Sequence, residues 1–182
     1  MVAFALGLLI PIVIIFMREN MNTRVRGRKD LENLTIPFIG EIPLFTRKKK
    51  GILGKKPQEV KAVIVKEGNR DIINEAFRVL RTNLEFMTGK DKTSNVIIMT
   101  SFNPGSGKSF LTMNIAVSLA IKGKKVLVID GDLRHASASS YIDSPDKGLS
   151  DYLGGRIDNL DEIIVPDPKH KSMDILPVGT IP

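Results

Sequence analysis

The sequence predicts an α/β fold, a parallel sheet with helical crossovers that is preceded by a transmembrane helix. Two short and mainly apolar stretches, residues 95–101 and 125–130, lie on either side of a helical stretch over residues 109–122. Apolar strands that alternate with a helix are typical of a buried parallel sheet. Residues 173–178 are expected to form a third strand, and Gly123 to end the helix.

The composition narrows the class of protein. The 182 residues carry a formal net charge of +7, which suits an anionic partner such as a membrane surface or a nucleotide. The chain has no cysteine, so a disulfide scaffold and a thiolate metal site are excluded. It has no tryptophan and only 5% aromatic residues, which argues against a stacking surface for nucleic acid.

The N-terminus is apolar and uncharged from Val2 to Met17. As a helix this run reaches about 24 Å, so we expect a short membrane span or the end of a longer one. Basic residues follow the run from Arg18 onward, which places residues 18–182 in the cytoplasm. A signal peptide would carry its charges before the apolar run, and a buried core helix seldom lacks a polar face.

The rest of the chain divides into a linker and a domain. Residues 18–68 contain prolines and the basic run at 47–50, 55 and 56, a composition typical of a solvated linker that can also contact anionic lipids. Residues 69–182 are expected to form the domain, in which Ile73, Phe77, Leu80 and Leu84 mark the buried stripe of a helix.

The strongest motif is the stretch Pro-Gly-Ser-Gly-Lys-Ser at residues 104–109, between an apolar strand and a helix, as a P-loop requires. Its glycines let backbone N–H groups turn toward phosphate oxygens, Lys108 reaches the β- and γ-phosphates, and Ser109 binds Mg²⁺. Phe102 stands where the usual pattern has its first glycine. The nucleotide-binding residues are therefore expected to be Pro104, Gly105, Ser106, Gly107, Lys108, Ser109 and Phe110.

Two carboxylates follow the second strand. Asp130 and Asp132 lie at its carboxyl end, where open α/β sheets place their sites. Together with Ser109 they are candidate ligands of hydrated Mg²⁺, and either can accept a proton from an attacking hydroxyl. The catalytic residues are therefore expected to be Lys108, Asp130 and Asp132, with no choice between the two aspartates.

A third motif, Glu75-x-x-Arg78-x-x-Arg81, places three charges on one helix face. By spacing alone a solvated face is the simpler interpretation.

These motifs in combination resemble the bacterial tyrosine kinase (BY-kinase) family, in its one-chain Wzc type. The segment 35–43 is similar to the proline-rich stretch beside the second membrane helix, and residues 75–81 to the ExxRxxR oligomerisation helix. Residues 101–109 resemble Walker A, which often lacks its first glycine in this family, and residues 129–134 resemble Walker A′. Residues 148–153 and 174–182 resemble later core segments.

The resemblance implies a function for the complete protein. ATP with Mg²⁺ would be used to phosphorylate tyrosines of a neighbouring subunit, in a homo-oligomeric ring built through Glu75, Arg78 and Arg81. The ring would sit in the bacterial inner membrane, with the polysaccharide export machinery and a counteracting tyrosine phosphatase as partners. A Walker B strand and a tyrosine-rich tail are expected after residue 182, so this chain is expected to be an inactive fragment.

Two other classes of protein remain open. Membrane-associated partitioning-type P-loop ATPases share the fold, but they carry an early lysine in the loop where this chain has Asn103, and they lack an N-terminal span. A non-enzymatic co-polymerase scaffold is the other alternative.

Overall fold

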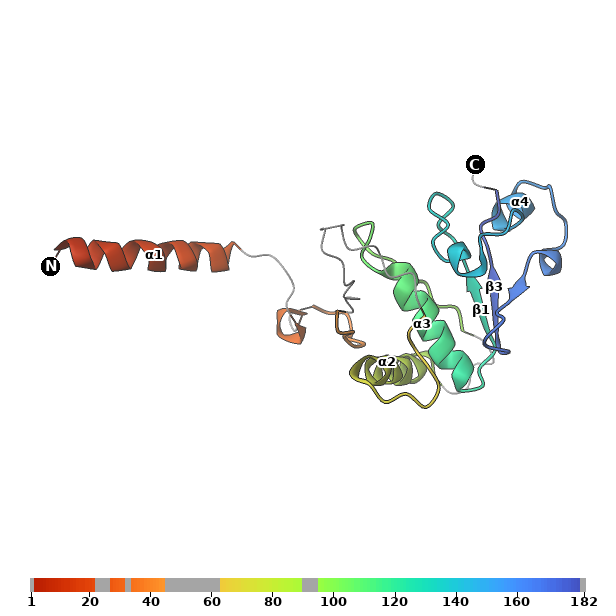
Figure 1. Ribbon diagram of the computed structural model, residues 1–182, viewed down its shortest axis with the longest axis horizontal. Coiled ribbons are helices and arrows are strands. Elements are labelled where there is room, and N and C mark those ends of the chain that lie inside the picture. Colours follow the sequence, from red (N-terminus) through yellow and green to blue (C-terminus); the bar gives the residue numbers. More distant parts are fainter. Residues whose placement is uncertain (1, 22–26, 32–33, 45–62, 90–94, 181–182) are drawn as a thin grey trace, which may run out of the picture. The chain divides into compact units, whose positions relative to one another are not determined.

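The computed structural model describes residues 2–21, 27–31, 34–44, 63–89 and 95–180. The chain divides into two compact units, Met1–Phe38 and Ile39–Pro182. The first unit holds helix α1 (Val2–Asn20) and the 3-10 helix η1 (Arg28–Leu31) (Figure 1). In the part of the chain that is described, no helix combines the length and the apolar content that crossing a membrane requires. The span expected over residues 1–17 is therefore not confirmed, and the basic run at 47–56 lies outside the described residues.

The second unit is an α/β domain in which two helices precede the first strand, and helical segments separate that strand from the last two (Figure 1). Its elements are α2 (Ile72–Thr88), α3 (Lys108–Ile121), β1 (Val126–Ile129), η2 (Ser139–Ile142), α4 (Leu149–Leu153), η3 (Leu160–Glu162), β2 (Val165–Pro166) and β3 (Met173–Leu176). The predicted helix at 109–122 and strands at 125–130 and 173–178 are confirmed. Gly123 follows α3 with φ +82°, as expected of a residue that ends a helix.

The sheet has the strand order β1-β3-β2. Strands β1 and β3 pair in parallel, with Val126 opposite Met173 and Ile129 opposite Leu176. The short strand β2 adds to the other side of β3 in the antiparallel direction. The parallel pairing was predicted, whereas the antiparallel edge was not, because two residues carry no periodic signal.

The strand predicted over residues 95–101 is absent from the described structure. Residues 95–100 have no strand pairing, and the side chains of Val96 and Ile98 are 92% and 86% exposed. On β1, Leu127 and Ile129 are about half exposed as well. A strand forms only where a neighbour completes its hydrogen bonds, and no described strand lies on the side of β1 away from β3. The prediction is wrong for this chain because the apolar run lacks a pairing partner.

Helix α3 is the centre of the domain, since it packs on α2 and also on β1 and β3. The predicted stripe on α2 is confirmed: Phe77, Leu80 and Leu84 are buried and Ile73 packs against the same core. The ring of Phe77 meets that of Phe110 on α3 edge to face, at 6.1 Å between centroids. Because this stripe of α2 packs tightly against α3, it fixes the position of α3, which begins at Lys108.

Two segments before α2 join the domain through side-chain amides. Asn114, fully buried on α3, accepts hydrogen bonds from the backbone N–H groups of Ile64 and Val65 at 2.8 and 3.1 Å. Asn83 on α2 donates to the carbonyl of Ile39 at 2.6 Å. Buried backbone N–H and C=O groups need such hydrogen-bond partners where no neighbouring strand supplies them.

The assignment of residues 1–17, 18–68 and 69–182 to membrane, linker and catalytic domain stays a prediction about the complete protein.

A buried carboxylate fixes the loop that leaves β3. Asp151 on α4 accepts hydrogen bonds from the N–H groups of Gly148 and Thr180, from the Thr180 hydroxyl and from Arg156. A side chain at Gly148 would come within 2.4 Å of the Pro177 carbonyl oxygen. The close approach of α4 to the end of β3 therefore requires glycine there.

This carboxylate should make stability depend on pH. The backbone N–H of Thr180 is the main cause of a lowered pKa at Asp151, which outweighs the effect of burial. A lowered folded-state pKa stabilises the fold fully above the ordinary value near 3.8, and this stabilisation is lost as pH falls through the folded-state pKa. We expect Asp151→Asn to lower the thermal unfolding temperature at pH 7 and to flatten its decline below pH 4. Thermal unfolding followed by circular dichroism tests this, and an equal acid dependence in both proteins would contradict it.

Candidate functional site

The glycine-rich loop leads directly into α3. Gly105 and Gly107 have φ values of +73° and +87°, a backbone region that other residues rarely adopt. Gly107 is the N-cap of α3, and no side chain caps the helix there. The Ser106 hydroxyl donates to the Asn103 carbonyl at 2.6 Å and braces the turn. Both backbone conformations favour glycine, as the P-loop prediction expects, and phosphate binding by the loop stays a prediction.

The start of α3 offers backbone hydrogen-bond donors that no other described residue uses. Its first intrahelical bond runs from the N–H of Leu111 to the Gly107 carbonyl at 2.9 Å, so the preceding N–H groups have no partner within the helix. Among the residues described, none forms a hydrogen bond or an ion pair with the ammonium group of Lys108. Free N–H groups, the helix dipole and an unpaired ammonium together favour an anion such as a phosphate.

Asp130, at the end of β1, is held firmly. Its side chain is 4% exposed, and its Oδ2 atom accepts two hydrogen bonds from Ser139, from the backbone N–H and from the hydroxyl, both at 2.7 Å. Among the described residues, the other oxygen, Oδ1, receives only the N–H of Asp132 at 3.3 Å. One oxygen of the carboxylate is therefore committed to the fold and the other is nearly free.

Asp132 is more exposed and begins a turn. Its Oδ1 lies 3.2 Å from the backbone N–H and 3.3 Å from the ring Nδ1 of His135. Burial alone would raise the pKa of Asp132, but these hydrogen bonds and the charge of His135 outweigh burial and lower it. Asp132 therefore stays ionised at neutral pH, which suits a metal ligand better than a strong base.

The start of α3 and the carboxyl end of β1, after which Asp130 and Asp132 follow in the sequence, lie at the same end of the domain (Figure 1). Helix α3 runs away from the loop, the chain turns after Ile121, and β1 returns alongside α3. The carboxyl end of β1 therefore faces the same way as the start of α3. No group of three or more acidic or histidine ligands occurs among the described residues. Two carboxylates and the Ser109 hydroxyl nevertheless suit Mg²⁺, which usually takes one or two carboxylates and completes its shell with water and phosphates.

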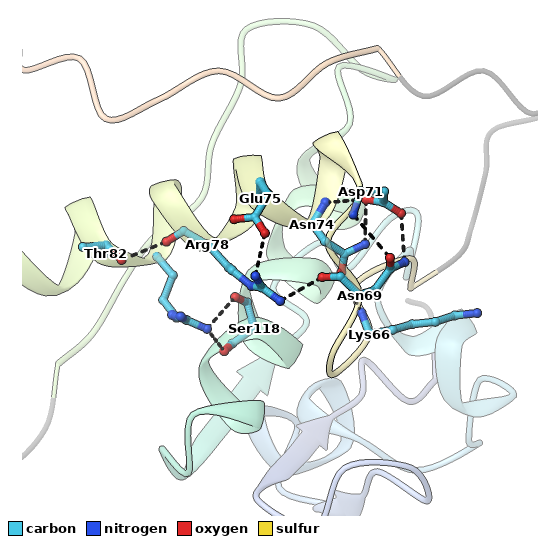
Figure 2. A network of polar contacts seen from close by, with 9 residues as sticks. Lys66, Asn69, Asp71, Asn74, Glu75, Arg78, Thr82 and Ser118 are labelled. Atoms are coloured by element: carbon cyan, nitrogen blue, oxygen red, sulfur yellow. Dashed lines mark hydrogen bonds and ion pairs between the residues drawn. The ribbon is translucent and has the colours of Figure 1, made fainter.

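The three charges on α2 differ in what they contact. Arg78 donates to Glu75 at 2.6 Å and to the Asn69 carbonyl at 2.8 Å, near the start of the helix (Figure 2). Arg81 instead reaches α3, where its Nη1 donates to the carbonyl and the hydroxyl of Ser118 at 2.8 and 3.2 Å. Glu75 and Arg78 form an exposed pair, whereas Arg81 ties two helices together. Their role in assembly stays a prediction.

Sequence reasoning missed three features of this region. It gave His135 no partner, although the ring contacts Asp132. It gave no role to Ser139, which lies nine residues after Asp130 and meets it only through the fold. It treated Arg81 as equivalent to Arg78. Only His135 had a local signal, since an aspartate at the start of a turn commonly accepts a hydrogen bond from a backbone N–H group close after it in the chain.

Comparison with known proteins places the site in a family context. Residues 97–165 match the family model described as the CobQ/CobB/MinD/ParA nucleotide binding domain. The chain is 29% identical over 183 residues to a putative tyrosine-protein kinase in the cps region of Klebsiella pneumoniae, which covers 97% of this chain. It is 30% identical over 190 residues to the tyrosine-protein kinase Etk of Escherichia coli K12, which covers 98% of this chain.

A solved structure agrees with these relatives. The kinase domain of the Escherichia coli tyrosine kinase ETK superposes with a TM-score of 0.69 at 29% sequence identity, over 87% of this chain and 61% of that one. The chain spans about a quarter of the length of the two curated relatives, 25% and 26%.

Proposed function

Since the chain belongs to the bacterial tyrosine kinase family, we propose that it is the nucleotide-binding part of an ATP-dependent protein-tyrosine kinase. The complete protein would phosphorylate itself on tyrosine and thereby regulate the polymerisation and export of capsular polysaccharide or exopolysaccharide. The observation that carries this proposal is the uncapped start of α3, with Lys108 unpaired among the described residues, at the same end of the domain as the carboxyl end of β1, which Asp130 and Asp132 follow in the sequence.

The proposed site binds ATP through its phosphates. Residues 104–110 would surround them, with backbone N–H groups on the phosphate oxygens and Lys108 beside the β- and γ-phosphates. Ser109, Asp130 and Asp132 would hold Mg²⁺, which supplies positive charge against the phosphates when it is bound. The chain's own contribution to catalysis is to orient the γ-phosphoryl group and to stabilise its developing charge.

The tyrosine that receives the phosphoryl group would come from another subunit. Its hydroxyl proton would be accepted by one of the two carboxylates. Asp132 is the more accessible of the two, but its lowered pKa makes it a weak base. Glu75 and Arg78 offer an exposed charged face on α2 for contact with a neighbour in a homo-oligomer. A counteracting tyrosine phosphatase would complete the cycle.

The proposed location is the inner face of the bacterial plasma membrane, with residues 18–182 in the cytoplasm. The support is the apolar run of residues 2–17 and the basic residues that follow it. The alternative function is a partitioning-type ATPase, since the matching family model includes MinD and ParA. The loop of this chain has Asn103 where that class carries a lysine, which favours the kinase.

The test is tyrosine phosphorylation by the complete protein and by the 182-residue chain. Purified complete protein incubated with ATP and Mg²⁺ should accumulate phosphotyrosine, detected by immunoblot and mass spectrometry. The 182-residue chain should give none on a tyrosine-rich peptide, because its described metal ligands come from only two positions, the start of α3 and the end of β1. ATP hydrolysis by the complete protein without phosphotyrosine would instead support the partitioning-type ATPase.

A further inference from the structure

A buried hydrogen-bond chain connects Asp130 to the loop that leaves β3. The backbone N–H of Val178 donates to the Ser139 hydroxyl oxygen at 2.8 Å, and that hydroxyl lies 2.7 Å from Oδ2 of Asp130. The backbone N–H of Ser139 reaches the same Oδ2 atom at 2.7 Å. Ser139 is 1% exposed, Asp130 is 4% exposed and Val178 is fully buried. Water therefore has little access to these bonds.

The direction of each hydrogen bond is fixed. The Val178 N–H can only donate, so the Ser139 oxygen accepts from it and the hydroxyl proton is left for Asp130. Oδ2 then accepts two hydrogen bonds, both at 2.7 Å. From the part of the chain that the structure describes, Oδ1 receives only the long contact from the N–H of Asp132, at 3.3 Å. The carboxylate is thus held in one orientation, with Oδ1 as its available atom.

We propose that Ser139 is the positioning residue of the metal site: it locks Asp130 so that Oδ1 is the oxygen available to Mg²⁺ bound with the nucleotide. This inference rests on the proposed function and deepens it, because it assigns Asp130 to the metal. A residue that orients a metal ligand by a hydrogen bond typically changes metal affinity 10- to 100-fold when it is removed.

The hydrogen bonds from Asp130 through Ser139 to Val178 also link the proposed metal site to helix α4. Val178 belongs to the loop after β3, and the N–H of Ser150 on α4 donates to its carbonyl at 2.9 Å. Asp151 holds the next residues of that loop through Thr180. Ser139 therefore takes its own orientation from a segment that α4 fixes, which makes Asp130 rigid before any metal binds.

The test measures the Mg²⁺ requirement of nucleotide binding in the complete protein. A fluorescent ADP analogue is titrated with and without Mg²⁺, and Mg²⁺ is then titrated at a fixed analogue concentration. In Ser139→Ala we expect the Mg²⁺ concentration for half-maximal binding to rise roughly 10-fold or more, while affinity without Mg²⁺ stays unchanged. Ser140→Ala is the matched control, because its hydroxyl donates to the Ser137 carbonyl and not to Asp130.

Three results of these titrations would overturn the role proposed for Ser139. A purely structural Ser139 would change affinity with and without Mg²⁺ equally, or would change only thermal stability, and either result overturns the inference. If Ser139→Ala does not fold, Ser139→Cys replaces it, since a thiol keeps the shape but donates weakly, and an unchanged Mg²⁺ requirement there overturns the inference. Wild-type protein that binds no nucleotide with Mg²⁺ would overturn the proposed function as well, whereas unaltered variants of a binding-competent wild type overturn the inference alone.

Discussion

Replacing Lys108 by methionine in the complete protein should lower its affinity for ATP and ADP roughly 10- to 100-fold, because a hydrogen bond to a charged group contributes about 1.5–3 kcal/mol. Lys108 is the first residue of α3, and none of the described residues pairs with its ammonium group. Methionine keeps the length and the helix propensity of the side chain. The thermal unfolding temperature without nucleotide should therefore stay the same.

The measurement is a titration of a fluorescent ADP analogue in the presence of Mg²⁺. Lys125→Met is the matched control, since Lys125 is exposed and precedes β1, at the opposite end of α3 from the loop. It should bind like the wild type. Equal affinity in the Lys108 variant would remove the phosphate site from the start of α3, and with it the proposed function.

The sequence was sufficient for the parts of the fold that local patterns determine. The buried stripe of α2, the helix after the loop and the strands β1 and β3 follow from apolar periodicity and from the glycines beside them. The glycine turn before α3 and the position of the aspartates after β1 were predictable for the same reason, because both are encoded in consecutive residues, and their chemical roles stay predictions.

Most of the failures concern contacts between distant parts of the chain. The run at 95–101 has the composition of a strand, yet strand formation depends on a neighbour that no local pattern reports. Ser139 meets Asp130 and Val178 only because β1, η2 and the end of β3 converge. Arg81 lies on the same face of α2 as Arg78 by sequence spacing. In the structure, α2 packs on α3 and the Arg81 side chain reaches Ser118. Periodicity indicates a helix face and leaves open what that face touches.

The difference between the arginines predicts how assembly should respond to mutation. The double variant Glu75→Ala/Arg78→Ala of the complete cytoplasmic domain should remain folded, because an exposed pair contributes only a few tenths of a kcal/mol. If this face contacts a neighbouring subunit, removing each desolvated charge pair there should cost roughly 2–5 kcal/mol. The variant should then be a folded monomer that binds nucleotide and no longer phosphorylates in trans.

Arg81→Ala should behave differently, because Arg81 donates to Ser118 of its own chain and its Nε atom is buried. We expect it to lower the stability of the isolated subunit by about 1–3 kcal/mol through the loss of these bonds. Light scattering gives the oligomer size and thermal unfolding gives the stability. Glu67→Ala/Arg70→Ala removes the same two charge types from exposed positions before α2 and should change neither the oligomer size nor the stability.

An unchanged oligomer in the Glu75/Arg78 variant would mean that this face is only solvated. A stable monomeric Arg81→Ala would mean that Arg81 serves a neighbour and not the contact between α2 and α3.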